Sequence, residues 1–273
     1  MRMALRAPGA RAALATLAGV AILAAVAPWL LPDPYAMPDP VGARLLPPGA
    51  GHWLGTDVLS RDLLARFARG GAISLAIGVT AAVVASVLGG LVGLTAGAAG
   101  GITDRLLMRG TDILMTVPRA FLLLFVAAAW SDIPPWALTL LLGATGWYAV
   151  ARIVRAEAVR LVGTDAVVAA RALGAGRPRI IFRHLLPNVA GQLAVATALG
   201  VGEAMLLEAG LSFLGAGVRP PVPSWGGMIH EGKDVLLTAP WATIAPGLAL
   251  AAVVLATNRL GDALRDTFDP RTR

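Results

Sequence analysis

The chain of 273 residues has no cysteine and little charge. The absence of cysteine excludes a disulfide framework, a thiolate zinc site and a cysteine nucleophile. Only 14% of the residues are charged, whereas a soluble domain typically has about 25%. Hydrophobic residues make up 57% and the mean hydropathy is +0.73, which also excludes an intrinsically disordered chain. These values indicate an integral membrane protein.

Signatures of nucleotide, metal and hydrolytic chemistry are also missing from the sequence. The sole lysine, Lys233, lies in a Gly-Lys-Asp string that does not fit a phosphate-binding P-loop. The three histidines are far apart and lack metal-ligand spacing, and no nucleophile elbow or catalytic carboxylate pair is present. The net charge of +7 is spread between apolar runs rather than grouped on one stripe, which argues against nucleic acid as a partner. We therefore expect no enzymatic activity, no cofactor and no metal in this chain.

Long apolar runs are what the sequence does contain. A helix needs about 20 apolar residues to cross the bilayer, and six segments meet that length. They are Ala12–Leu31, Ala72–Ala96, Thr111–Trp130, Trp136–Val154, Val189–Ser212 and Trp241–Leu260. The first is longer than the apolar core of a signal peptide, so we interpret it as a retained helix. The sequence predicts an all-α membrane protein with six transmembrane helices.

The distribution of cations predicts the orientation of these helices. With the N-terminus in the cytoplasm, sixteen of the 23 basic residues fall on the cytoplasmic side, seven of them between Arg152 and Arg183. This asymmetry follows the positive-inside rule. The cluster Arg61–Arg69 is the exception, since it falls on the outer side. The predicted segments are a cytoplasmic tail (1–11), a first helix (12–31), an extracytoplasmic loop (32–71), a transmembrane core (72–260) and a cytoplasmic C-terminal tail (261–273).

Two sets of residues in the spans are candidates for a pathway or for helix packing. Gly89, Gly93, Gly97 and Gly101 recur every four residues, a spacing that permits close helix approach. Glu203 and Glu208 are the clear intramembrane acids, and such acids commonly mark a polar route. Five residues separate them, so they project from different helix faces and do not form one relay.

The cytoplasmic loop between the fourth and fifth spans, residues 155–188, is rich in arginine and regular in pattern. Asp165 is expected to cap a short helix, Ala166–Leu173, which glycines then end. Pro178 begins a second short helix, and Pro187-Asn188 leads into the fifth span. The two helices could dock in a groove of a partner protein, or they could lie against lipid headgroups.

The loop resembles the EAA motif of ABC-importer permeases, E-A-A-x3-G-x9-I-x-L-P. The alanine pair, the glycine and the Leu-Pro pair are in register, while Val168 replaces the glutamate and His184 the isoleucine. Further strings, H-W-L-G-T-D at residues 52–57, L-S-F-L-G at 211–215 and P-P-V-P-S-W-G at 220–226, are similar to the dipeptide, oligopeptide and nickel branch. The resemblance covers roughly residues 50–270.

The resemblance implies a type I importer permease of the bacterial inner membrane, with both termini in the cytoplasm. Its partners would be a second permease chain, two ATP-binding-cassette ATPases, an extracytoplasmic solute-binding protein and the bilayer. The residues implied in coupling to the ATPases are Asp165, Val168, Ala169, Ala170, Arg171, Ala172, Leu173, Gly174, Ala175, His184, Leu186 and Pro187. Those implied in contact with the binding protein, if they do not simply cap the helices, are Pro220, Pro221, Pro223, Ser224, Trp225 and Gly226. The alternative is a self-contained secondary carrier or channel.

Overall fold

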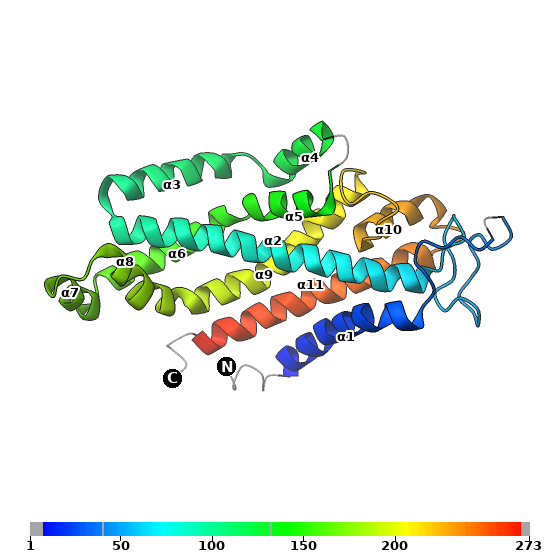
Figure 1. Ribbon diagram of the computed structural model, residues 1–273, viewed down its shortest axis with the longest axis horizontal. Helices are drawn as coiled ribbons and strands as arrows, with labels where there is room; N and C mark the ends of the chain where they lie inside the picture. Colours follow the sequence, from blue (N-terminus) through cyan, green and yellow to red (C-terminus); the bar gives the residue numbers. More distant parts are fainter. Residues whose placement is uncertain (1–7, 40, 131–132, 269–273) are drawn as a thin grey trace.

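The computed structural model describes residues 8–39, 41–130 and 133–268, and these form helices joined by loops (Figure 1). The long helices are α1 (Pro8–Leu30), α2 (Leu63–Ala99), α9 (Leu186–Phe213) and α11 (Trp241–Phe268). The shorter ones are α3 (Gly101–Thr116), α4 (Arg119–Ala129), α5 (Pro135–Ala144), α6 (Trp147–Val162), α7 (Asp165–Ala172), α8 (Arg177–Ile180) and α10 (Trp225–Gly232). A π-helical turn (Ile181–Leu185) joins α8 to α9, and a 3-10 turn (Lys233–Val235) follows α10.

Five helical segments of the described chain are long and apolar enough to cross a membrane. They are Gly9–Leu30, Leu63–Ala99, Pro135–Val162, Arg177–Phe213 and Trp241–Phe268. The pair α3 and α4 provides a sixth span if the two helices cross together, although they are bent by 75°. The all-helical membrane architecture predicted from hydropathy is therefore confirmed.

The third span differs from its prediction as one helix, Thr111–Trp130. The helix begins earlier, at Gly101, and breaks at Val117 and Pro118, where the backbone is extended. Pro118 causes the break because proline lacks the N–H that a helix interior needs and disfavours helical backbone at the residue before it.

Helix ends also depart from the predicted spans. Helix α2 begins at Leu63 rather than Ala72, so its 37 residues reach about 55 Å, well beyond the hydrocarbon layer. The fifth span begins at Arg177 rather than Val189. Helix α11 continues to Phe268, into the predicted tail. Hydropathy located the apolar parts of these helices and missed the extensions at their ends. Most of the predicted N-terminal tail, residues 1–7, lies outside the described residues.

Helix α2 runs through the bundle and packs against α1, α5, α6 and α9. Its contact with α6 is made by the glycine ridge. A Cβ on Gly89 would lie 2.6 Å from Val150 Cβ, and one on Gly93 would lie 2.5 Å from the carbonyl oxygen of Ala151. A Cβ on Gly97 would likewise lie 2.6 Å from Ala158 Cβ. The three glycines thus pack α2 against α6, whereas Gly101 has open space around it.

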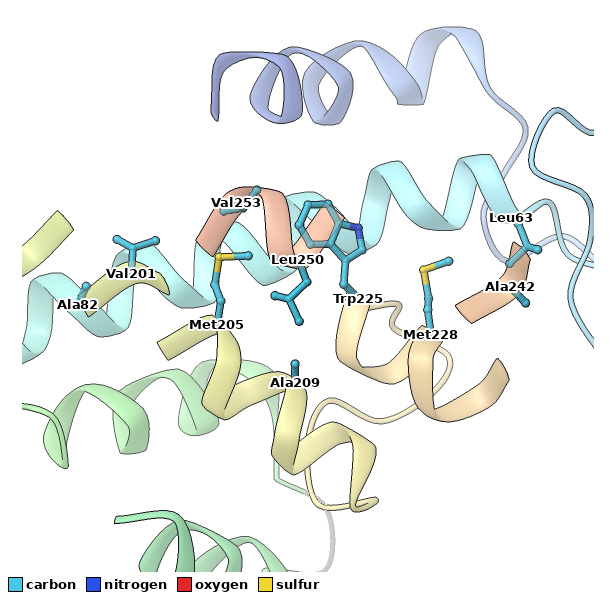
Figure 2. Packing of buried hydrophobic residues seen from close by; sticks show 10 residues of the cluster. All are labelled: Leu63, Ala82, Val201, Met205, Ala209, Trp225, Met228, Ala242, Leu250 and Val253. Carbon is cyan, nitrogen blue, oxygen red and sulfur yellow. The ribbon is translucent and has the colours of Figure 1, made fainter. Parts of the chain in front are cut away.

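The bundle has two distinct ends, with α7 at one and α10 at the other (Figure 1). At the α10 end, Trp225, Met228 and Leu63 contribute to a buried cluster that includes Met205 and Leu250 (Figure 2). At the α7 end, a second cluster joins α2, α6, α7 and α9. The start of α1 lies beside the end of α11, since Gly9 faces Arg259. Both of these helix ends are on the α7 side of the bundle.

Candidate functional site

Helix α7 begins one residue earlier than the sequence suggested. Thr164, with an extended backbone, occupies the N-cap position, and Asp165 is the first residue of the helix. Asp165 was therefore wrongly expected to cap the helix by its position before the first turn. Its carboxylate instead lies within that turn, where negative charge is stabilised by the helix dipole.

The end of α7 is a tight glycine corner. The backbone N–H groups of Gly174 and Ala175 donate to the carbonyl oxygens of Arg171 and Ala170, both at 2.9 Å. Gly174 has a φ of +84°, in the left-handed region that glycine adopts without steric cost. The chain reverses here and leads directly into α8.

Helix α7 has one buried face and one exposed face. Val167 is buried in the cluster with Leu161 and Ile180, which fastens the helix to the bundle. Val168 is 54% exposed and Leu173 is 89% exposed, and Ala169, Arg171 and Ala172 are exposed beside them. A rigidly mounted helix with exposed apolar side chains is suited to contact with a protein partner.

The second part of the EAA-like segment does not form a separate short helix. Residues Arg177–Phe213 run as one helical segment through the π-helical turn that contains His184. Pro187 explains the turn, because proline cannot donate to the carbonyl four residues earlier and its ring would clash there. The wider turn, in which the Leu186 N–H reaches back to Ile181, relieves that clash.

The segment expected to contact a binding protein divides into exposed and buried residues. Pro220 and Pro221 are exposed, whereas Pro223, Ser224, Trp225 and Gly226 are buried. The indole Nε1 of Trp225 donates to the Phe67 carbonyl oxygen at 3.0 Å. These buried residues pack α10 onto α2 and α9, so only the two exposed prolines are accessible to a partner here.

Glu208 belongs to the same packed region. Its Oε1 accepts hydrogen bonds from Ser212 Oγ at 2.7 Å and Ser224 Oγ at 2.9 Å. Ser224 Oγ also accepts from the Gly227 N–H and caps α10. Glu208 is fully buried by this chain, so its role here is to tie α9 to the start of α10.

Two of the three arginines that contradicted the charge rule, Arg61 and Arg66, lie in a buried ion network at the α10 end, whereas Arg69 is exposed. Arg61 pairs with Asp57 at 2.6 Å and with Glu231 at 2.7 Å, and Arg66 pairs with Glu231 at 2.8 Å. Because Arg61 and Arg66 are neutralised inside the protein, they carry no orientation signal, whereas the exposed Arg69 still departs from the charge rule. Sequence reasoning missed the network, although charges clustered in a charge-poor chain were the available signal.

A second ion pair links α4 to α9. Arg119 Nη1 lies 2.5 Å from Glu203 Oε1, and its other guanidinium nitrogens donate to the Leu142 carbonyl oxygen and to Thr145 Oγ1. Glu203 and Arg119 are 84 residues apart, so the sequence did not reveal the pairing. Among the described residues, no group of three or more acidic or histidine side chains could hold a metal ion.

Comparison with known proteins identifies the family. Residues 89–273 match the family described as the binding-protein-dependent transport system inner membrane component. The chain is 42% identical to a putative peptide permease protein of Brucella suis over 82% of this chain and 74% of the relative. It is 38% identical to the oligopeptide transport system permease protein OppC of Bacillus subtilis over 83% of this chain and 74% of the relative. A putative peptide transport system permease protein of Brucella suis is 43% identical over 84% of this chain and 77% of its own length.

These matches agree with the helical spans and with the EAA-like loop, and they favour the importer over a secondary carrier. The chain is a multi-pass inner-membrane protein and a transport subunit rather than an enzyme. It belongs to the family of binding-protein-dependent transport system inner membrane components, as the permease subunit of an ABC importer.

Proposed function

We propose that this permease forms one half of the translocation pathway of a peptide importer. The names of its relatives in Brucella suis and Bacillus subtilis support peptides as the substrate class. A second permease chain would complete the pathway, two ATP-binding-cassette ATPases would supply the energy, and an extracytoplasmic binding protein would deliver the peptide. Both termini would lie in the cytoplasm, as the cation asymmetry favours.

The observation that carries this proposal is the way α7 packs against the bundle with one face exposed. One face of the helix is buried against α6 and α8, while Val168 and Leu173 project from the other. Helix α7 follows the Pro135–Val162 span and precedes the Arg177–Phe213 span, so a push on it is transmitted to two membrane helices. A domain motion can reach a bundle with two stable arrangements only through a rigid connection, and α7 provides one.

The same geometry supports a coupling role for α7. An ATPase cleft would receive the apolar residues Val168 and Leu173, and the exposed Arg171 would orient the contact. Asp165, Ala169, Ala170, Ala172, Gly174 and Ala175 complete the helix and its corner. His184, Leu186 and Pro187 act indirectly, by shaping the turn that joins α8 to α9.

Charge substitution on the exposed face of α7 tests this proposal. We expect Leu173→Asp to abolish ATP-dependent peptide uptake by the complete importer in proteoliposomes and to prevent copurification of the ATPases. The matched control is Leu237→Asp, because Leu237 is also highly exposed, at 99%, but follows the 3-10 turn after α10 rather than α7. ATPases that copurify undiminished with the Leu173 variant would refute the coupling role. Failure of the unmodified complex to import peptide would refute the substrate class.

A further inference from the structure

The Arg119–Glu203 ion pair joins two helices of the candidate membrane spans. Glu203 is ten residues from the end of α9 at Phe213, which places it about 15 Å from that end of the span. The hydrocarbon layer is about 30 Å thick, so a layer whose edge lies at Phe213 would hold the carboxylate near its middle. Ionisable side chains at this depth are unfavourable unless they meet a partner, a polar cavity or water.

Arg119 is held in place from within the chain. Its Nη2 donates to the Leu142 carbonyl oxygen at 2.6 Å and its Nε donates to Thr145 Oγ1 at 3.2 Å, at the junction of α5 and α6. Gly146 makes room for the guanidinium, since a Cβ there would lie 2.9 Å from Arg119 Nη2. The Arg119 side chain is only 21% exposed. It therefore acts as a fixed positioning residue for the carboxylate beside it.

Glu203, in contrast, projects away from the bundle. Its side chain is 64% exposed, and it shares one exposed stripe of α9 with Leu206 and Gly210. Buried residues of α9, such as Met205 and Glu208, face the interior instead. Arg119 pairs with one carboxylate oxygen, and the exposed remainder of the carboxylate would be disfavoured against lipid tails, which favours a polar surrounding for this face of α9.

The helix break before Arg119 is exposed beside the ion pair. Helices α3 and α4 are bent by 75° at Val117 and Pro118, and both of these residues are exposed. Unwound backbone at membrane depth is tolerated only where protein covers it or where it lines a water-filled cavity. The described residues leave the break uncovered, so it faces a partner subunit or a water-filled space, directly before the arginine that pairs with Glu203.

We propose that Glu203 lines the water-filled translocation pathway and binds the ammonium group of the passing peptide, with Arg119 as its positioning residue. This inference rests on the proposed function for the peptide substrate. A carboxylate accepts short, charge-assisted hydrogen bonds from an ammonium group. Because Arg119 already neutralises Glu203, the site attracts the cation weakly and releases it, as passage through a pathway requires.

The absence of cysteine in the chain permits a direct test of accessibility. Glu203→Cys in the assembled importer is treated with a charged, membrane-impermeant methanethiosulfonate reagent, and labelling is followed on this chain after gel separation. The matched control is Leu255→Cys, which is 58% exposed on α11 at the same depth, since Gly202 packs against Val254 and Thr257. We expect the cysteine at position 203 to react and the one at 255 to remain unlabelled. An unreactive cysteine at 203, or equal labelling of both, would overturn the assignment to the pathway.

The contact with peptide is tested by charge removal and charge retention. We expect Glu203→Gln to lower the rate of trialanine uptake by the complete importer about tenfold, the effect of losing one hydrogen bond to a charged group. Glu203→Asp should retain uptake within about threefold, and Leu255→Gln should match the unmodified protein. The ATP hydrolysed per trialanine imported should rise about tenfold for Glu203→Gln, because the cycle continues while fewer peptides pass.

The possible failures point to different conclusions. A Glu203→Gln variant whose hydrolysis and uptake fall together, with an unchanged ratio, would overturn the peptide contact and indicate a structural ion pair. Equal uptake by Glu203→Gln and the unmodified protein would also overturn it. If the unmodified importer does not take up trialanine or other peptides, the proposed function fails, whereas the cysteine labelling still reports whether Glu203 faces water.

Discussion

Arg66, near the start of α2, donates two hydrogen bonds through Nη2 to the carboxylate of Glu231 in α10, at 3.0 and 2.8 Å. The two residues are 165 positions apart in the chain. Arg61 donates to the same carboxylate, so one glutamate joins the loop before α2, the start of α2 and α10. The α10 end of the permease is therefore fastened by charge as well as by the packing of Trp225.

Removal of the Glu231 carboxylate should destabilise this end of the protein. Glu231→Ala leaves the buried cations Arg61 and Arg66 with Asp57 as their remaining partner. Breaking a buried ion pair typically costs about 3–5 kcal/mol, so we expect a clear fall in the melting temperature of the purified permease. Asp112→Asn is the control, since the Asp112–Arg152 pair is exposed and 4.0 Å apart and should change the melting temperature little. Equal melting temperatures for the Glu231 variant and the unmodified protein would contradict the stabilising role.

The glycine ridge should not tolerate even one added carbon. In Gly93→Ala, the new Cβ would lie 2.5 Å from the Ala151 carbonyl oxygen and 2.8 Å from Val154 Cβ. Overpacking of this kind costs about 1–3 kcal/mol, and we expect lower thermal stability and a lower yield of folded protein. Gly110→Ala in α3 serves as the control, because nothing lies within 4 Å of its added Cβ. A Gly93→Ala variant as stable as the unmodified protein would show that α2 and α6 can move apart without loss of stability.

Substitutions at two nearby glycines in the corner after α7 should have different effects on transport. Gly174 has a φ of +84°, whereas Gly176 has an ordinary φ of −69°. Gly174→Pro cannot adopt the left-handed conformation, so we expect it to displace α7 and abolish transport while membrane insertion is preserved. Gly174→Ala should cost about 1–2 kcal/mol locally, and Gly176→Ala should transport normally. Uptake assays in proteoliposomes, with membrane fractionation to monitor insertion, separate these cases; normal uptake by Gly174→Pro would refute the requirement for the corner.

Deletion of Val168–Ala175 provides a more severe test of the same segment. The deletion removes the exposed face of α7 and its corner, while the spans on either side retain their apolar length. We therefore expect insertion into the membrane but no transport and no binding of the ATPases. Undiminished affinity of purified ATPases for the shortened protein would contradict the coupling role.

Local sequence features predicted local structure well. Apolar runs of sufficient length located the membrane-embedded helices, because each span must satisfy its backbone hydrogen bonds internally. Glycine at position 174 predicted the end of α7, because its left-handed backbone conformation is a local property. The sequence left open whether Trp225 contacts a partner or caps the helices, since an aromatic residue in a Pro/Gly-rich loop can either project or pack, and the contact with Phe67 shows that it packs.

By itself, the sequence determined the membrane class, the helical architecture and the family, since hydropathy, helix breakers and ordered motifs are properties of neighbouring residues. The tertiary structure alone decided that the scarce charges at Arg66 and Arg119 are neutralised by Glu231 and Glu203. It also decided that Glu208 is enclosed and Glu203 exposed, although both lie on one apolar helix. The physical reason is that the energy of a charge in a membrane depends on what surrounds it. Those surroundings come from helices that are far apart in the chain.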